Sequence, residues 1–257
     1  MGYNKGLAIF IDILGTKGRS FDELYRINKI FHKELNKEKK PFWDKIKKHV
    51  SSFSDCAYIV YEFSDNVLHD NIEVAGLIEM SLRDLTLTIT CFAFNGFLCR
   101  GGVAYGDLFF DKENSVLFGP AINEAYLLET KAIMPRIIFS ETLINDLFIK
   151  DKPLYLDGIT FTDNYDKHPF FNYLYGIMTV DLDEIINATN NQMFLLSNEP
   201  YSFKEICETI KQYSKNVIDT SSDHKILAKH LWQLNYINLV DTSYKNTVEY
   251  FSKHIKK

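Results

Sequence analysis

The sequence predicts an α+β protein in which helices cover a mixed β-sheet, and three observations support this class. Residues 7–14 are almost all apolar, which is typical of a central strand buried on both faces. Apolar side chains recur every three or four positions between residues 75 and 92, which predicts one long helix. The chain has 257 residues, of which 46% are apolar and 25% charged, so it can bury a sizeable core and is not disordered.

The first half of the chain contains signals for a helix and a hairpin after this strand. Residues 15–18 interrupt the apolar run, and Ser20 with Glu23 is the capping box that begins a helix. Two strand-like runs at residues 49–53 and 56–61 are separated by only two residues, which predicts a β-hairpin.

The long helix that follows ends at Asn95-Gly96. We then expect strands at 97–105 and 107–111 joined at Gly106, a strand at 116–118, a helix at 121–130, a strand at 135–139 and a helix at 141–149. The order strand, helix, hairpin, helix, hairpin, helix, strand describes a ferredoxin-like mixed sheet covered by helices on one side.

A domain boundary is expected near residue 151. Residues 1–150 would form one domain, and residues 151–257 a C-terminal α/β extension packed on it. In the extension we expect strands at 155–162 and 170–180 and helices at 203–213 and 223–236.

Charge and cysteine usage exclude several classes of partner. The formal net charge of −5 argues against a protein that binds nucleic acid or anionic membranes. The longest uncharged stretch, residues 85–99, is too short and too polar to span a bilayer. The four cysteines stand singly in apolar runs and no secretory signal precedes the first strand, so we expect reduced thiols and a cytoplasmic protein.

Two aspartates stand where carboxylates are hard to explain structurally. Asp12 interrupts the apolar strand and Asp55 lies at the tip of the adjacent hairpin. A buried carboxylate is costly unless it is paired or binds a cation, and two carboxylates facing each other favour a divalent ion between them. This is the requirement of a two-metal phosphoryl-transfer site. The alternative is that Asp12 caps the turn at Gly15 and Asp55 serves the hairpin turn.

The segment Gly15-Thr16-Lys17-Gly18 leads from this strand into the capped helix. Backbone N–H groups, a helix N-terminus and a lysine together form a seat for phosphates. The spacing is not that of a P-loop, and a simple turn is the alternative.

Four blocks of sequence resemble one enzyme family, the class III nucleotidyl cyclases, over roughly residues 5–150. These blocks are Phe10-Ile11-Asp12-Ile13-Leu14-Gly15, Phe53-Ser54-Asp55, Arg100-Gly101-Gly102-Val103-Ala104-Tyr105-Gly106 and Phe118-Gly119-Pro120-Ala121-Ile122-Asn123. Within the family the chain is most similar to the bacterial pyrimidine cyclases of the Pycsar anti-phage systems.

The resemblance implies a role for each matching residue. Asp12 and Asp55, with the carbonyl of Ile13, would bind two divalent metal ions, Mn²⁺ or Mg²⁺. Asn123 would orient the ribose. The substrate-binding residues would be Ile13, Leu14, Gly15, Thr16, Lys17, Ser51, Arg100 and Val116, with the loop 15–17 holding the β- and γ-phosphates.

The chain departs from the family pattern at three positions. Ser51 stands where adenylyl cyclases have the lysine that reads adenine, and Val116 stands where they have its acidic partner, which disfavours ATP. Leu127 replaces the arginine that stabilises the pentavalent phosphorus. Lys131 and Arg136 are the candidates to replace its charge. The alternatives are that Lys131 is only an exposed lysine on a helix and that Arg136 is only an arginine at the start of a strand.

The function predicted on this basis is a homodimeric cyclase that converts UTP, or CTP, to the 3′,5′-cyclic monophosphate and pyrophosphate. The product would act on a separate effector protein in anti-phage defence. Arg100 either contacts substrate across the dimer or forms a structural salt bridge. The alternatives are a purine cyclase for ATP or GTP, a cyclase-like polymerase or diguanylate synthase, and a degenerate nucleotide-binding domain that regulates a partner.

Overall fold

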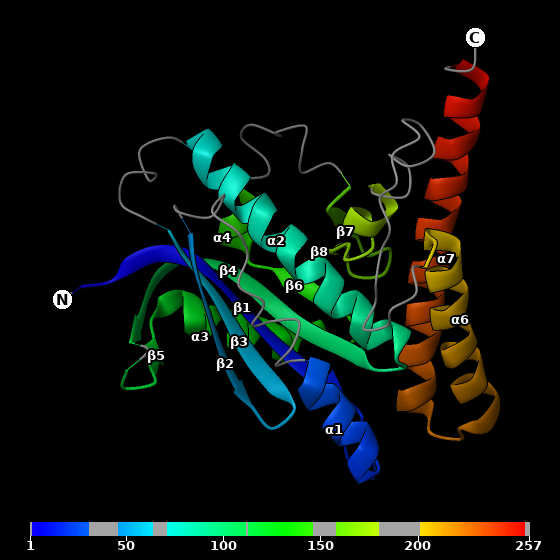
Figure 1. Ribbon diagram of the computed structural model, residues 1–257, viewed down its shortest axis with the longest axis horizontal. Helices are drawn as coiled ribbons and strands as arrows, with labels where there is room; N and C mark the ends of the chain where they lie inside the picture. Colours follow the sequence, from blue (N-terminus) through cyan, green and yellow to red (C-terminus); the bar gives the residue numbers. More distant parts are fainter. Residues whose placement is uncertain are drawn as a thin grey trace.

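A computed structural model describes residues 2–30, 46–63, 71–111, 113–145, 158–179 and 201–254 (Figure 1). The strands are β1 (Asn4–Leu14), β2 (Ile46–Phe53), β3 (Cys56–Phe63), β4 (Leu98–Asp111), β5 (Val116–Phe118), β6 (Ile137–Phe139), β7 (Thr160–Thr162) and β8 (Pro169–Phe171). The helices are α1 (Phe21–Ile30), α2 (Asn71–Phe94), α3 (Pro120–Ala132), α4 (Glu141–Leu143), α6 (Phe203–Thr220) and α7 (His224–His254).

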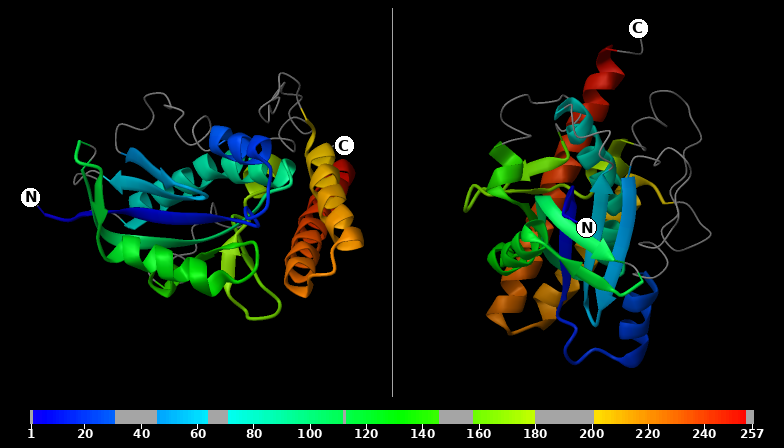
Figure 2. Two further views of the ribbon diagram at one scale, coloured as in Figure 1. Left: turned by 90° about the horizontal axis from the view of Figure 1, so that it is seen from below. Right: turned by 90° about the vertical axis from the view of Figure 1, so that its left-hand side faces the viewer.

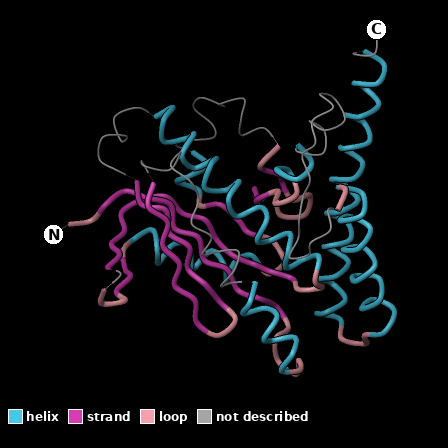
Figure 3. Tube along the Cα trace, in the orientation of Figure 1, coloured by secondary structure: helices cyan, strands magenta, loops and turns pink. Residues whose placement is uncertain are grey.

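The described strands form one mixed sheet in the order β2-β3-β1-β4-β6-β8-β7, with β5 paired to β4 (Figure 3). Within the group β2-β3-β1-β4 each strand is antiparallel to the next, whereas β6 is parallel to β4. A β-α-β-β-α-β chain with this order of strands has the outline of a ferredoxin-like unit. The predicted α+β class with a mixed sheet is therefore confirmed.

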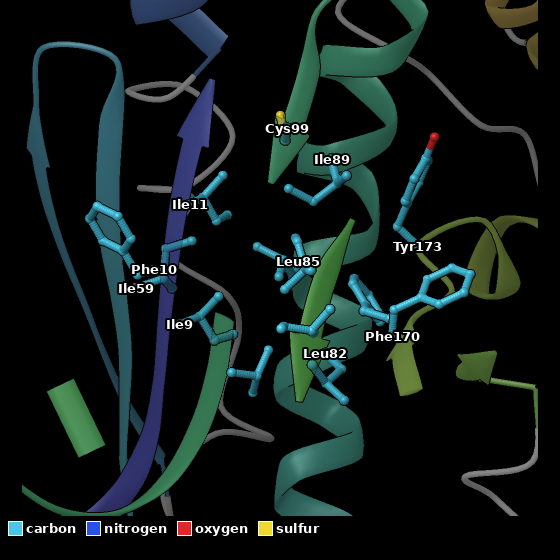
Figure 4. Close-up of a cluster of buried hydrophobic side chains, with 14 of the residues drawn as sticks. Ile9, Phe10, Ile11, Ile59, Leu82, Leu85, Ile89, Cys99, Phe170 and Tyr173 are labelled. Atoms are coloured by element: carbon cyan, nitrogen blue, oxygen red, sulfur yellow. The ribbon is translucent and has the colours of Figure 1, made fainter. Parts of the chain in front are cut away.

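Helices lie on both faces of the sheet, so the prediction that they cover one side is wrong (Figure 2). On one face Ile9 and Ile11 of β1 point towards Leu85 of α2 (Figure 4). On the other face the ring of Phe10 contacts that of Tyr126 in α3, with 5.4 Å between the centroids. Successive residues of a strand point to opposite faces, so a continuous apolar run needs a cover on each.

Two further predicted boundaries are wrong. Strand β4 runs without a break from Leu98 to Asp111, because Gly106 lies opposite Gly6 in the ladder with β1 and forms no turn. The strand expected at 170–180 ends at Phe171, and residues 175–179 are helical. The apolar run there covers a buried helical turn, which a short hydrophobic pattern cannot distinguish from a buried strand.

The helices α6 and α7 pack against each other at one end of the sheet (Figure 1). Both continue well beyond the ranges expected from the sequence. A capping box of Ser202 and Glu205 begins α6, and a buried ion pair joins Lys211 of α6 to Asp241 of α7 at 2.7 Å. The boundary near residue 151 lies outside the described residues. Because β8 pairs with β6, strands from both sides of this boundary belong to one sheet.

The four cysteines are free thiols, as predicted, and Cys56 alone among them is half-buried. In the part of the chain that the structure describes, no helix combines the length and apolarity needed to cross a membrane.

The contact between α3 and β4 depends on Gly102. A Cβ atom at this position would lie 2.4 Å from both the Ala125 carbonyl oxygen and the Leu128 Cβ. Gly102→Ala should therefore lower the free energy of unfolding by about 2 kcal/mol, because α3 must move away from the sheet. Gly106→Ala is the matched control in the same strand, since its Cβ would meet only the Ala121 Cβ at 3.7 Å. Urea unfolding of both variants tests this, and equal stability of the two would contradict it.

Candidate active site

The structure brings Asp12 and Asp55 to the same end of the sheet. Asp12 lies opposite Cys56 of β3 and Arg100 of β4 in the two ladders that flank β1. Asp55 directly precedes β3, in the hairpin turn where Ser54 has a φ of 54°. The Asp55 carbonyl accepts a hydrogen bond of 2.9 Å from the N–H of Ile13, so the hairpin tip is held against the end of β1.

Burial and the neighbouring carboxylates make the ionisation of Asp12 unfavourable. Burial, together with the negative charges of Glu129 and Asp55, raises the pKa of Asp12 to about 6, although the nearby Arg100 opposes the shift. Burial, together with the same three carboxylates, raises the pKa of the Cys56 thiol. An excess of negative charge of this kind favours a bound cation.

Arg100 forms an ion pair with two carboxylates on different elements. Its Nε and Nη2 each lie 3.3 Å from Asp12 Oδ2, and its Nε contacts Glu129 Oε1. A salt bridge within the protomer was one of the two alternatives for Arg100, and the structure contains it.

Glu129 was not among the residues singled out from the sequence. It lies on the buried side of α3 with residues Ala121, Ala125, Leu128 and Ala132, and its exposed fraction is 6%. A carboxylate on the apolar stripe of a helix is as hard to explain as one inside an apolar strand. The criterion that identified Asp12 would therefore also have identified Glu129.

The loop between β1 and α1 has the backbone that its glycines suggest. Gly15 and Gly18 have φ values of 75° and 84°, a region that favours glycine. The Thr16 hydroxyl donates a hydrogen bond of 2.5 Å to Asp55 Oδ2, which ties the loop to the second aspartate. The predicted capping box is present, since the Ser20 N–H donates to Glu23 Oε2 at 2.9 Å.

The Arg19 side chain holds this loop at Gly15. Its Nε donates to the Gly15 carbonyl at 3.1 Å, and its guanidinium lies 4.5 Å from the centroid of the Phe97 ring. The Lys17 side chain is exposed beside it. The loop therefore presents a lysine and a helix N-terminus next to the aspartates.

Five further residues that the resemblance singled out are exposed on their elements. Asn123, Leu127 and Lys131 lie on the outer face of α3, and the exposed fraction of Leu127 is 57%. Ser51 in β2 and Val116 in β5 are also exposed. Asn123 and Lys131 thus lie on the opposite side of α3 from Glu129.

Arg136 is buried and paired inside the protomer. Its guanidinium contacts Asp163 Oδ2 at 2.7 Å and Asp166 Oδ1 at 2.9 Å, and its Nε donates to the Ala132 carbonyl at 3.2 Å. Its charge is therefore already balanced by two carboxylates.

The ligands available for a metal ion are oxygen atoms. Among the described residues, no group of three or more His, Cys, Asp or Glu side chains is arranged to hold a metal ion. The carboxylates of Asp12 and Asp55 and the Ile13 carbonyl provide the hard oxygen donors that Mg²⁺ and Mn²⁺ prefer, and the Glu129 carboxylate adds further negative charge beside Asp12. The residues fit such an ion on chemical grounds.

No protein-family model matches the chain, and no curated protein matches it in sequence. One solved structure to which it is similar is a bacterial light-regulated adenylyl cyclase. The TM-score is 0.38 and the sequence identity 15%, with 68% of this chain and 96% of that chain covered.

Proposed function

We propose that the chain is a nucleotidyl cyclase that converts a pyrimidine nucleoside triphosphate, UTP or CTP, into its 3′,5′-cyclic monophosphate and pyrophosphate. The observation that carries this proposal is the pair Asp12 and Asp55, held together by the hydrogen bond from Ile13 to the Asp55 carbonyl, in a cluster rich in negative charge. Such a pair suits the binding of divalent cations that accompany a triphosphate.

The reaction joins the ribose 3′-oxygen to the α-phosphorus. The bond from that phosphorus to the bridging oxygen of pyrophosphate breaks, and the 3′-hydroxyl proton passes to solvent. Divalent ions bound by Asp12, Asp55 and the Ile13 carbonyl would supply Lewis acidity and neutralise charge. The β1–α1 loop would hold the terminal phosphates through its backbone N–H groups and Lys17.

A second protomer would complete the site. Asn123 and Lys131 are exposed on α3, where a partner chain can use them to orient the ribose and to neutralise charge at phosphorus. Ser51 and Val116 would leave the exocyclic groups of a purine without hydrogen-bond partners, which supports a pyrimidine substrate. The cyclic product would act on a separate effector protein.

A degenerate nucleotide-binding domain is the second candidate. Leu127 favours it, because an exposed leucine replaces the arginine of the family pattern while Arg136 is already paired with Asp163 and Asp166.

The two candidates are separated by incubating the purified chain with each of ATP, GTP, UTP and CTP in the presence of Mn²⁺ and identifying products by mass spectrometry. We expect cyclic UMP or cyclic CMP and an equal amount of pyrophosphate. Absence of any cyclic product would refute the enzyme, and cyclic AMP as the main product would refute the assignment of the base.

A further inference from the structure

The buried Glu129 and the half-buried Arg100 form an ion pair next to the candidate metal ligand Asp12. Arg100 lies between two carboxylates, one on β1 and one on α3, and Glu129 is the more deeply buried of the two. Nothing in the proposed reaction uses Glu129, and its side chain is too deeply buried to contact a nucleotide. Its position therefore needs another explanation.

The two contacts of Arg100 differ in length. Charge-assisted hydrogen bonds between a guanidinium and a carboxylate are about 2.7–2.9 Å long. Both hydrogen bonds from Arg100 to Asp12 Oδ2 are longer, at 3.3 Å, and the contact of Arg100 with Glu129 Oε1 is a closer ion pair without hydrogen-bond geometry. Arg100 is thus shared between Asp12 and Glu129, and its hydrogen bonds to Asp12 are long.

A guanidinium and a divalent cation would compete for the same carboxylate. If Arg100 formed a short two-point ion pair with Asp12, a metal ion would have to break it before binding. Glu129 offers Arg100 a second anion that is buried and fixed on α3. The strength of the contact between Arg100 and Glu129 therefore determines how available Asp12 is.

We propose that Glu129 is a positioning residue that shares Arg100 with Asp12, keeps the ion pair between Arg100 and Asp12 long, and so sets the affinity of Asp12 for a divalent cation. This inference rests on the proposed function, because it takes Asp12 as a metal ligand. It assigns Glu129 no contact with substrate.

The test measures the binding of Mn²⁺ to the full chain without nucleotide. Electron paramagnetic resonance of free Mn²⁺ and calorimetry both report this binding. Glu129→Gln should weaken Mn²⁺ binding about tenfold, because Arg100 then has Asp12 as its main anionic partner. In the Arg100→Gln background the same substitution should change the affinity less than about twofold, since the competing cation is absent. Asp12→Asn should remove the binding.

This double-mutant cycle distinguishes competition between Arg100 and Mn²⁺ for Asp12 from a direct effect of the Glu129 charge on Mn²⁺. If Glu129 acted only through its own negative field, Glu129→Gln would weaken Mn²⁺ binding equally with and without Arg100, and the proposal would be overturned. Arg100→Gln leaves Glu129 buried without its partner and can impair folding. In that case Glu129→Gln alone is the test, because glutamine has nearly the size of glutamate. An unchanged Mn²⁺ affinity of this variant overturns the proposal as well.

The matched control is an ion pair between β1 and β4, the strands that carry Asp12 and Arg100. Lys5 of β1 and Asp107 of β4 lie opposite each other with 2.8 Å between Nζ and Oδ1, and both are exposed. Asp107→Asn should leave the Mn²⁺ affinity unchanged. Absence of Mn²⁺ binding in the wild type would refute this inference and the proposed function together. If the double-mutant cycle gave the expected Mn²⁺ affinities but no cyclic nucleotide formed from any triphosphate, only the proposed function would be refuted.

Discussion

Replacing Asp12 or Asp55 with asparagine should lower the rate of cyclic-nucleotide formation at least about a hundredfold, because each change removes an anionic ligand from the site where the triphosphate charge must be neutralised. Asparagine has nearly the shape of aspartate, and the backbone hydrogen bond from Ile13 to residue 55 does not use the side chain. The measurement is the initial rate with UTP and with CTP at saturating Mn²⁺. Full turnover in either variant would refute the assignment of that residue.

The control for this loss is the stability of the same variants. The pKa of Asp12 in the folded protein is about 6, against 3.8 for a free side chain, so the folded state binds the proton more readily than the unfolded state. The ionised carboxylate therefore reduces stability above about pH 6, and this cost disappears as the pH falls through 6 towards 3.8. Asp12→Asn should thus be at least as stable as the wild type at pH 8 in EDTA, with the difference shrinking at pH 5. If Asp12→Asn lost its activity because it was unfolded, this expected stability would be contradicted.

The central fold could be predicted because its signals are local. The apolar run of β1, the capping box of Ser20 and Glu23, and the helical period of α2 each predict one element from neighbouring residues. The position of α3 on the opposite face could not be read in this way, since a helical pattern does not show which side of a sheet it covers. It depends on the close approach at Gly102, which only the folded chain reveals.

The candidate site was partly predictable for the same reason. Asp12 and Asp55 stand out in the sequence because each occupies a place where a carboxylate is unfavourable, and the ladder then brings them to one end of the sheet. Glu129 is missed because the resemblance draws attention in α3 only to Asn123, Leu127 and Lys131. Its pairing with Arg100 joins a helix to a strand far away in the sequence, and no local pattern encodes that contact.

Arg136 is the residue for which sequence and structure lead to the most different expectations, and its substitution tests them. The exposed fractions of Arg136 and Asp163 are 5% and 8%, and Asp163 also accepts a hydrogen bond of 2.7 Å from the Trp232 indole. Arg136→Met would leave Asp163 buried without its cation, so the free energy of unfolding at pH 7 should fall by about 3 kcal/mol or more. Urea unfolding measures this, with Arg83→Met as the control, because the ion pair of Arg83 with Glu79 is exposed at the arginine and should contribute less than about 1 kcal/mol.

The pH dependence of Arg136→Met gives a second, independent check. A hydrogen bond from Arg136 is the main reason why the pKa of Asp166 lies at about 2, below its usual value of 3.8. The pKa is lowered in the folded state, so the stabilisation is complete above pH 3.8 and is lost as the pH falls towards 2. The difference in stability between wild type and variant should therefore be constant near neutral pH and narrow below about pH 4. A variant that unfolds like the wild type yet forms product about a hundredfold more slowly would instead support Arg136 as the cation that acts at phosphorus.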